Sequence, residues 1–163
     1  DWRHHGEAVR KTDKSKYIKV AKSIFGWQAV NETQHRWYNK DNPSDECPIC
    51  KKEVETQEHI FTCGHPASRA AQKGEIDRIG SWMKKQKYGL YMISTIQRNL
   101  RAYMGNSTPE ERERMNMTEG QCTGSRAIVQ AAVKEQEEIG WKHFFSGRLS
   151  KKWQEALEKE HEA

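Results

Sequence analysis

Three cysteines and one histidine, all between residues 47 and 63, are the side chains of this sequence best spaced for chemistry. Their spacing is C-x2-C-x8-H-x3-C. A C-x2-C turn supplies two thiolates from one tight loop, and an H-x3-C pair places two donors on the same side of a helical turn. Zinc takes four such nitrogen or sulfur donors in a tetrahedron. The spacing therefore predicts one zinc ion bound by four protein ligands: Cys47, Cys50, His59 and Cys63.

A zinc ion with four protein ligands has no open coordination position, so we expect the site to be structural and not catalytic. His65 is an alternative fourth ligand, but it lies just beyond Cys63 and closes a helical turn poorly, which favours His59. Glu55 and Glu58 are expected around the site or in solvent, because three thiolates already satisfy a soft ion. A redox C-x2-C motif would follow a strand of a βαβ unit, and the sequence predicts no such unit.

The elements that position these ligands are predicted to be helices. Apolar residues recur with helical spacing over 14–27, about 68–87, 90–104 and 125–139. Thr108, Pro109 and Glu111 form a capping box that starts a further helix, and Ser150 is expected to cap the last one. The predicted fold class is mainly α, a domain of at least five helices organised around a small structural zinc hairpin.

The predicted core is thin, since only 34% of the residues are hydrophobic and 31% are charged. Six Trp, five Tyr and four Phe compensate in part, because each aromatic side chain buries a large area. Trp82, Trp141 and Trp153 are expected to be mostly buried. The helix that begins at Thr108 carries alternating acidic and basic residues, 110–114, which we expect to form a solvated face.

Charge divides the chain into segments. Residues 1–40 hold nine Lys and Arg against four Asp and Glu, residues 41–66 hold two against six, and residues 67–104 hold eight against two. An acidic metal module thus lies between two basic segments. We expect residues 1–66 to form a basic helix plus the zinc-binding module, and residues 67–163 to form a helical C-terminal region.

Clustered cysteines beside a suitably spaced histidine favour metal binding over a disulfide framework, and hence a reducing compartment, nucleus or cytoplasm. The fourth cysteine, Cys122, has no nearby partner and is expected to be a loop or partly buried thiol. The sequence contains no stretch of 18 apolar residues, so we expect no membrane span. The sequence begins at Asp1, without a secretory apolar region, and we expect it to be a fragment or a processed product.

The segment CPICKKEVETQEHIFTC resembles the zinc-binding region on the C-terminal side of reverse transcriptases from non-LTR-type retroelements. The shared pattern is Cys-Pro-x-Cys, an acidic return with Glu-Thr, then Glu-His, two apolar residues and a closing Cys; here it covers residues 47–63. The preceding basic helix KYIKVAKSIFGW resembles the family more weakly. The resemblance implies an accessory domain of an RNA-directed DNA polymerase. The chain itself lacks the paired-aspartate motif that holds catalytic Mg2+, so we expect no catalytic residues in it.

Two hypotheses of function follow. In the first, the chain binds RNA or DNA: basic residues contact phosphates, and exposed aromatic side chains stack on bases. The aromatic candidates are Trp37, Tyr38, Tyr88 and Tyr91, and the phosphate contacts are assigned to two lysine sets, Lys16, Lys19 and Lys22, and Lys84, Lys85 and Lys87. In the second, the chain is a zinc-stapled scaffold that binds protein, either the remainder of its own polyprotein or a separate partner, and the aromatic side chains belong to the core.

Overall fold

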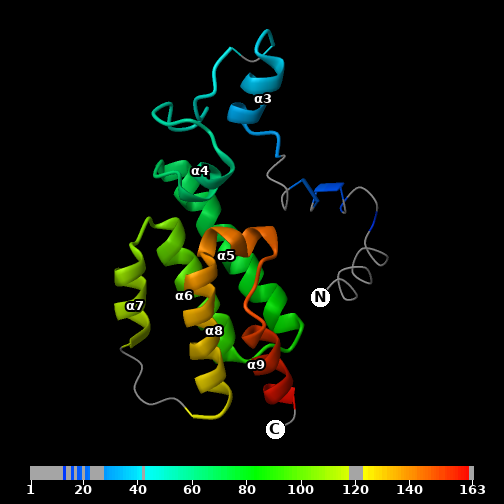
Figure 1. Ribbon diagram of the computed structural model, residues 1–163, viewed down its shortest axis with the longest axis vertical. Coiled ribbons are helices and arrows are strands. Elements are labelled where there is room, and N and C mark those ends of the chain that lie inside the picture. The colour runs from blue at the N-terminus through cyan, green and yellow to red at the C-terminus, as the bar shows by residue number, and fades with distance from the viewer. Residues whose placement is uncertain are drawn as a thin grey trace.

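The computed structural model describes residues 13, 16, 18, 19, 21, 22, 28–41, 43–117 and 123–161. The described chain is mainly helical, as predicted (Figure 1). The elements with described bounds are α3 (Asn31–Tyr38), α4 (Gln57–Thr62), α5 (Pro66–Lys85), α6 (Leu90–Met104), α7 (Pro109–Met117), α8 (Ser125–Ile139), the 3-10 helix η1 (Trp141–Ser146) and α9 (Lys152–His161). The expectation of at least five helices is therefore confirmed.

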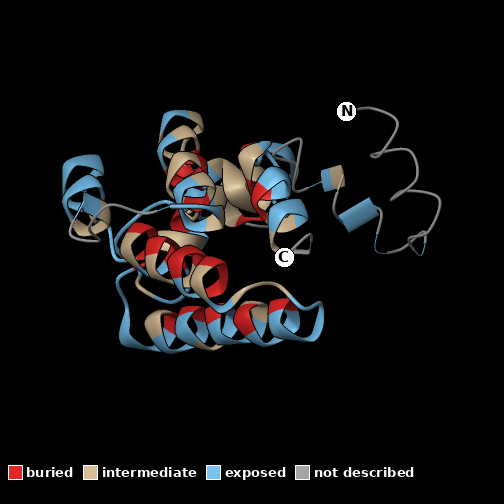
Figure 2. Cartoon of the chain, turned by 90° about the horizontal axis from the view of Figure 1, so that it is seen from below, coloured by how far each residue is buried: buried red, intermediate tan, exposed pale blue. Residues whose placement is uncertain are grey.

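Helix α6 is the centre of the fold. It packs against α4, α5, α7, α8 and η1. Its fully buried residues include Met92, Ile96 and Leu100, which recur at helical spacing on one face. Figure 2 shows buried residues on the sides of the helices that face one another and exposed residues on the outside. One core cluster joins α5, α6, α8, η1 and α9.

Gly80 lets α5 and α6 approach closely. A β-carbon at Gly80 would lie 2.2 Å from Nε2 of Gln97 on α6. That same Nε2 donates a hydrogen bond to the Ile76 carbonyl over 3.0 Å. The glycines within α5 do not interrupt the helix. Gly80 instead leaves room for the Gln97 side chain of α6.

Helices α8 and α9 form the other closely packed pair and are joined through η1. Gly140 ends α8 with a φ of 94°, a left-handed backbone that favours glycine. The Ser150 hydroxyl accepts the Lys152 amide at 3.1 Å, so Ser150 caps α9 as the sequence predicts. Trp153 of α9 is buried, as expected, and its indole donates to Gln136 of α8.

Helix α7 begins at the predicted capping box. The Thr108 amide donates to the Glu111 carboxylate over 2.8 Å, and the Glu111 amide donates back to the Thr108 hydroxyl over 3.2 Å. The expectation of a fully solvated face on this helix is wrong at one residue. Arg112 is buried, because its guanidinium forms a bidentate ion pair with Glu137 of α8.

Trp82 also departs from expectation, since 55% of its side chain is exposed. The buried side of α5 is formed by Ile76, Gly80 and Met83, and Trp82 lies about a third of a turn away from them. Trp141, by contrast, is 1% exposed and is buried as predicted.

Two sequence-based expectations fall on residues that are not described in full. Most of the predicted helix over 14–27, and Cys122, lie outside the described residues. Within the described part of the chain, no helix combines the length and apolar character that a membrane crossing requires.

Candidate metal centre

The first two ligand candidates lie on a tight turn. The Lys51 amide donates to the Cys47 carbonyl over 2.9 Å and closes the turn that carries Cys47 and Cys50. Lys51 has a φ of 52°, so the backbone leaves the turn in the left-handed region. The chain then returns antiparallel, with a single bridge between Glu46 and Val54 and a 2.8 Å hydrogen bond from the Cys47 amide to the Glu53 carbonyl.

The other two ligand candidates lie on α4. The Thr56 hydroxyl accepts the His59 amide over 2.9 Å and caps the start of this short helix. The Cys63 amide donates to the His59 carbonyl over 2.7 Å at its end. His59 and Cys63 are thereby one helical turn apart and point to the same side, as the H-x3-C spacing predicts.

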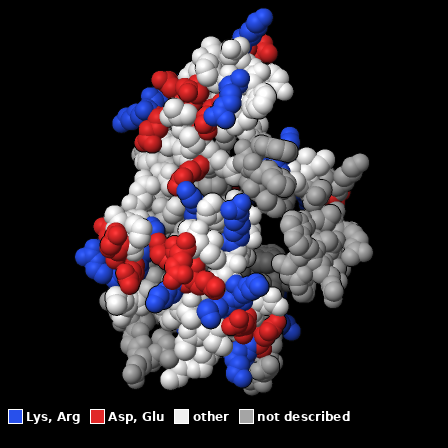
Figure 3. All heavy atoms as spheres, viewed as in Figure 1, with Lys and Arg blue, Asp and Glu red and all other residues white. Residues whose placement is uncertain are grey.

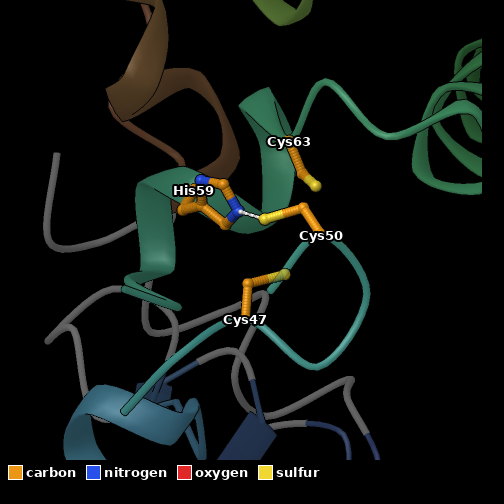
Figure 4. Close-up of side chains that lie close together, drawn as sticks. All are labelled: Cys47, Cys50, His59 and Cys63. Atoms are coloured by element: carbon orange, nitrogen blue, oxygen red, sulfur yellow. Dashed lines mark hydrogen bonds between the residues drawn. The ribbon is translucent and has the colours of Figure 1, made fainter. Parts of the chain in front are cut away.

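The four side chains converge (Figure 4). One donor atom from each of the four residues, three Sγ atoms and an imidazole nitrogen, lies within 4.8 Å of the other three. Cys50 Sγ and His59 Nε2 are 3.4 Å apart. Tetrahedral ligands of one ion lie about this far from one another when metal–sulfur bonds are about 2.3 Å and metal–nitrogen bonds about 2.0–2.1 Å. The group can therefore hold one metal ion.

The second imidazole nitrogen has a carboxylate partner. His59 Nδ1 lies 3.3 Å from Glu53 Oε2. A histidine that ligates through Nε2 commonly donates its other N–H to a carboxylate, which fixes the tautomer and the ring orientation. Glu53 thus supplies the carboxylate that orients the His59 ring. The sequence-based interpretation considered Glu55 and Glu58 for the surroundings of the site and missed Glu53.

The protein environment acts differently on two of the thiols. Backbone amides, first that of Lys52, lower the pKa of Cys50 to about 7. Burial raises the pKa of Cys47 above its ordinary value. A metal ion binds the thiolate and displaces the proton. Of these two thiols, Cys50 therefore loses its proton the more readily.

Glu55 and Glu58 hold the module to its neighbours. The Glu55 carboxylate accepts the Asn31 amide of α3 over 2.8 Å. Glu58 accepts the Tyr103 hydroxyl of α6 over 3.4 Å. His65 is outside the ligand group: its Nδ1 accepts the Ala67 amide over 3.2 Å and caps α5.

Helix α5 and η1 complete the support of the ligand helix. Gln72 Nε2 of α5 donates to the Cys63 carbonyl over 3.3 Å and to the Ile60 carbonyl over 3.4 Å. Phe61 of α4 stacks on Phe145 of η1. The metal group therefore rests on the helical region and does not project from it on a linker.

The two predicted lysine sets belong to different elements of the structure. Lys16, Lys19 and Lys22 are exposed and helical, and Lys22 lines a hollow with Trp37 and Tyr38 of α3. Lys84 and Lys85 end α5, and Lys87 follows in the turn; all three are exposed.

Within the described residues, fold and site together define a helical domain with a Cys3His group that can hold one metal ion and whose histidine is next to a carboxylate. Comparison with protein-family models, with curated proteins and with solved structures finds no match for the chain.

Proposed function

We propose that the bound ion is zinc and that its role is structural. The donor set supports zinc, because three thiolates and one imidazole are the soft ligands that tetrahedral structural zinc sites use. Four protein donors leave no position for a substrate. Elemental analysis of protein purified without added metal should give one zinc per chain, and an iron or copper content in its place would refute the assignment.

We further propose that the zinc-stapled domain binds RNA or DNA and serves as a non-catalytic accessory domain of a retroelement reverse transcriptase. The observation that carries the binding proposal is the exposure of aromatic side chains beside lysines. Trp37 is 72% exposed and Tyr38 is 66% exposed, and both line one hollow of about 650 Å3 with Lys22. Aromatic rings in a positively charged groove stack on bases while the cations contact phosphates.

The reverse transcriptase context rests on the resemblance of residues 47–63 alone. The structure is compatible with it, because the lysines assigned to phosphate contacts are exposed and lie outside the acidic hairpin that carries the four ligand candidates. The metal module would then position the elements that carry these lysines and would not contact phosphate itself.

Salt dependence of binding tests the proposal. Labelled RNA and DNA should bind with a log–log salt slope of about -0.9 per phosphate contact for duplex DNA and about -0.7 for single strands. Charge reversal of Lys16, Lys19 and Lys22 should weaken binding to all sequences and flatten the slope. Reversal of Lys84, Lys85 and Lys87 should do the same.

Acidic residues on α7 provide a matched control. Figure 3 shows acidic side chains gathered on one face over α7 and α8. Charge reversal of Glu110, Glu111 and Glu113 should not weaken binding, because this face would not approach phosphate. If neither lysine variant changes affinity or slope, the nucleic-acid proposal fails.

A protein-binding scaffold is the second candidate, and exposed apolar residues on the metal hairpin favour it. Ile49, Val54 and Ile60 are each at least 40% exposed. Such residues around a rigid hairpin can pack against the remainder of a parent polyprotein. Loss of partner binding in an Ile49→Ser, Ile60→Ser variant that retains its zinc would support this candidate.

A further inference from the structure

The C-terminal end of α5 is closed by a Schellman motif with an unusual residue. The Tyr88 amide donates to the Met83 carbonyl over 3.1 Å, and the Lys87 amide donates to the Lys84 carbonyl over 3.1 Å. These two hydrogen bonds define the motif, which requires a left-handed residue directly after the cap. Here that residue is Lys87, with a φ of 63°.

The same motif ends two other helices of the chain. Asn106, with a φ of 60°, follows α6, and Gly147, with a φ of 74°, follows η1. Glycine is the usual residue at this position and asparagine the usual substitute, because the left-handed conformation crowds a β-carbon. A lysine at this position therefore opposes the local backbone preference. Such a conflict is expected where a side chain serves function.

The turn at Lys87 also brings two aromatic rings together. After this turn, the Tyr88 ring packs against the Trp82 ring of α5, with ring centroids 6.0 Å apart and ring planes at 41°. A contact of this kind between the residue after the turn and the last turn of the helix commonly accompanies the motif. Trp82 remains 55% exposed, and Lys84, Lys85 and Lys87, which follow it within five residues of the sequence, are exposed as well. The contact with Tyr88 restrains the Trp82 indole, part of which remains exposed to solvent.

We infer that this cap of α5, formed by Trp82, Tyr88, Lys84, Lys85 and Lys87, is a binding site for single-stranded nucleic acid. A base stacks on the Trp82 indole, and the lysines contact the adjoining phosphates. Lys87 occupies a position that favours glycine, and its charge faces the strand. This inference rests on the proposed nucleic-acid binding and deepens it by naming the strand class.

The preference for single strands follows from the chemistry of the surface. The bases of a duplex stack on one another, so an exposed indole has no free base face to meet, whereas lysines alone attract duplex and single strand through charge. An unpaired base offers its π-face to any aromatic ring, whatever its sequence. Stacking on Trp82 therefore adds affinity for single strands only.

The first test replaces the indole. Trp82→Ala should lower the affinity for labelled (dT)12 and rU12 about ten-fold, while the affinity for a 12-base-pair duplex changes less than two-fold. Leu90→Ala is the matched control, because Leu90 is an apolar residue beside the cap that is 73% exposed, and it should change neither affinity. Equal loss for single strand and duplex, or no loss for either, would overturn the stacking site.

The second test separates charge from fold. Lys87→Gly should raise the melting temperature, because glycine relieves the left-handed backbone, and should still weaken binding of both oligonucleotides. Asn106→Gly is the control for binding, which should not change; it also removes the 3.3 Å hydrogen bond from Asn106 to the Thr62 carbonyl, so its melting temperature is not compared. A Lys87→Gly variant that binds as tightly as the parent would refute the role of this lysine.

The two tests also distinguish the inference from the proposal beneath it. If the parent chain binds neither single strand nor duplex, the proposed function fails and this inference fails with it. If the parent binds both with a salt slope that the lysine variants flatten, and Trp82→Ala has no selective effect, the proposed function stands and only the stacking site is refuted.

Discussion

Phe61 of α4 stacks on Phe145 of η1, with ring centroids 4.1 Å apart and ring planes only 5° from parallel. In the sequence, Phe61 lies between the metal-ligand candidates His59 and Cys63, and Phe145 comes after α8. The pair is therefore a direct packing contact between the ligand helix and the C-terminal part of the core.

Replacing both rings should reveal a favourable coupling between them. Phe61→Ala and Phe145→Ala should each lower the free energy of unfolding, and the double variant should lose about 0.5–1.5 kcal/mol less than the sum of the two single losses. Urea unfolding of the zinc-loaded protein measures all three values. Leu149→Ala, at an exposed position, should change stability by less than about 0.5 kcal/mol. Additive losses would show that the stack contributes no coupling.

Metal removal should unfold the hairpin and spare the helical core. Residues 46–63 have one β-bridge and a single short helix, so a bound ion would contribute most of the order of the Cys47–Cys50 turn and its return. Structural zinc binding is worth on the order of 10–16 kcal/mol in zinc-finger peptides. With chelator and reductant present, hydrogen exchange by mass spectrometry should show lost protection in 46–63 and retained protection in α6 and α8.

Cys50→Ser offers the same experiment without a chelator. It removes one thiolate from the four-ligand group and should give the same exchange pattern in ordinary buffer. Lys52→Ala, a change at an exposed residue of the hairpin that is not a ligand candidate, should leave protection intact. Complete unfolding of α6 and α8 in the Cys50 variant would mean that the core depends on the ion, contrary to this prediction.

Stability should fall at alkaline pH because of Tyr103. Burial, followed by the Glu58 carboxylate, raises the pKa of Tyr103 above its usual range. Above pH of about 10 the unfolded chain loses this proton while the folded chain keeps it. The unfolded state then binds fewer protons, so the free energy of unfolding falls as pH rises, by at most about 1.4 kcal/mol per pH unit.

The difference between the parent and Tyr103→Phe isolates this effect from other groups that titrate in the same range. Urea unfolding at pH 9 and pH 11 should show a smaller alkaline loss in the variant. In Tyr103→Phe, absorbance at 295 nm should show one fewer tyrosine that titrates above the usual pH range. Identical alkaline losses in both proteins would contradict the assignment.

The Arg112–Glu137 ion pair should be among the most costly contacts to break. Arg112 is 8% exposed and Glu137 is 23% exposed, and the carboxylate also accepts the Trp141 indole over 2.8 Å. Removal of one partner leaves a poorly solvated charge, which typically costs about 3–5 kcal/mol for a buried pair. Arg112→Ala should lower the free energy of unfolding by about 3 kcal/mol in urea, since Glu137 keeps some solvent contact.

Arg114→Ala is the control for this prediction, because Arg114 lies on the exposed side of the same helix. It should change stability by less than about 0.5 kcal/mol. Equal, small effects of the two substitutions would show that the buried pair holds α7 only weakly.

Features that depend on local spacing were predictable from the sequence. The ligand group needs only a C-x2-C turn and an H-x3-C helical turn, and both are set by neighbouring residues. The caps at Thr108 and Ser150 are equally local, since a side chain bonds an amide two or three residues away. Helical periodicity located the buried side of α6 for the same reason.

Features that depend on packing between distant segments were missed. Glu53 supports His59 because the hairpin return pairs residue 53 with Cys47, a register that composition does not reveal. Arg112 looked solvated in its charged helix, and only the approach of α8 buries it. Trp82 was assigned to the core because it lies on the apolar stripe of its helix with Ile76, Ile79 and Met83, yet which part of that stripe is buried depends on where α6 crosses α5.

The closeness of the three thiols has a consequence for the protein without its metal. Each Sγ lies within 4.8 Å of the others, and Cys50, with a pKa of about 7, is substantially a thiolate at neutral pH. A thiolate beside a second thiol is readily oxidised to a disulfide. If the ion left in the presence of air, it could not bind again, because the crosslinked cysteines would no longer present free thiolates. A bound ion would thus protect these cysteines from oxidation as well as hold the hairpin together.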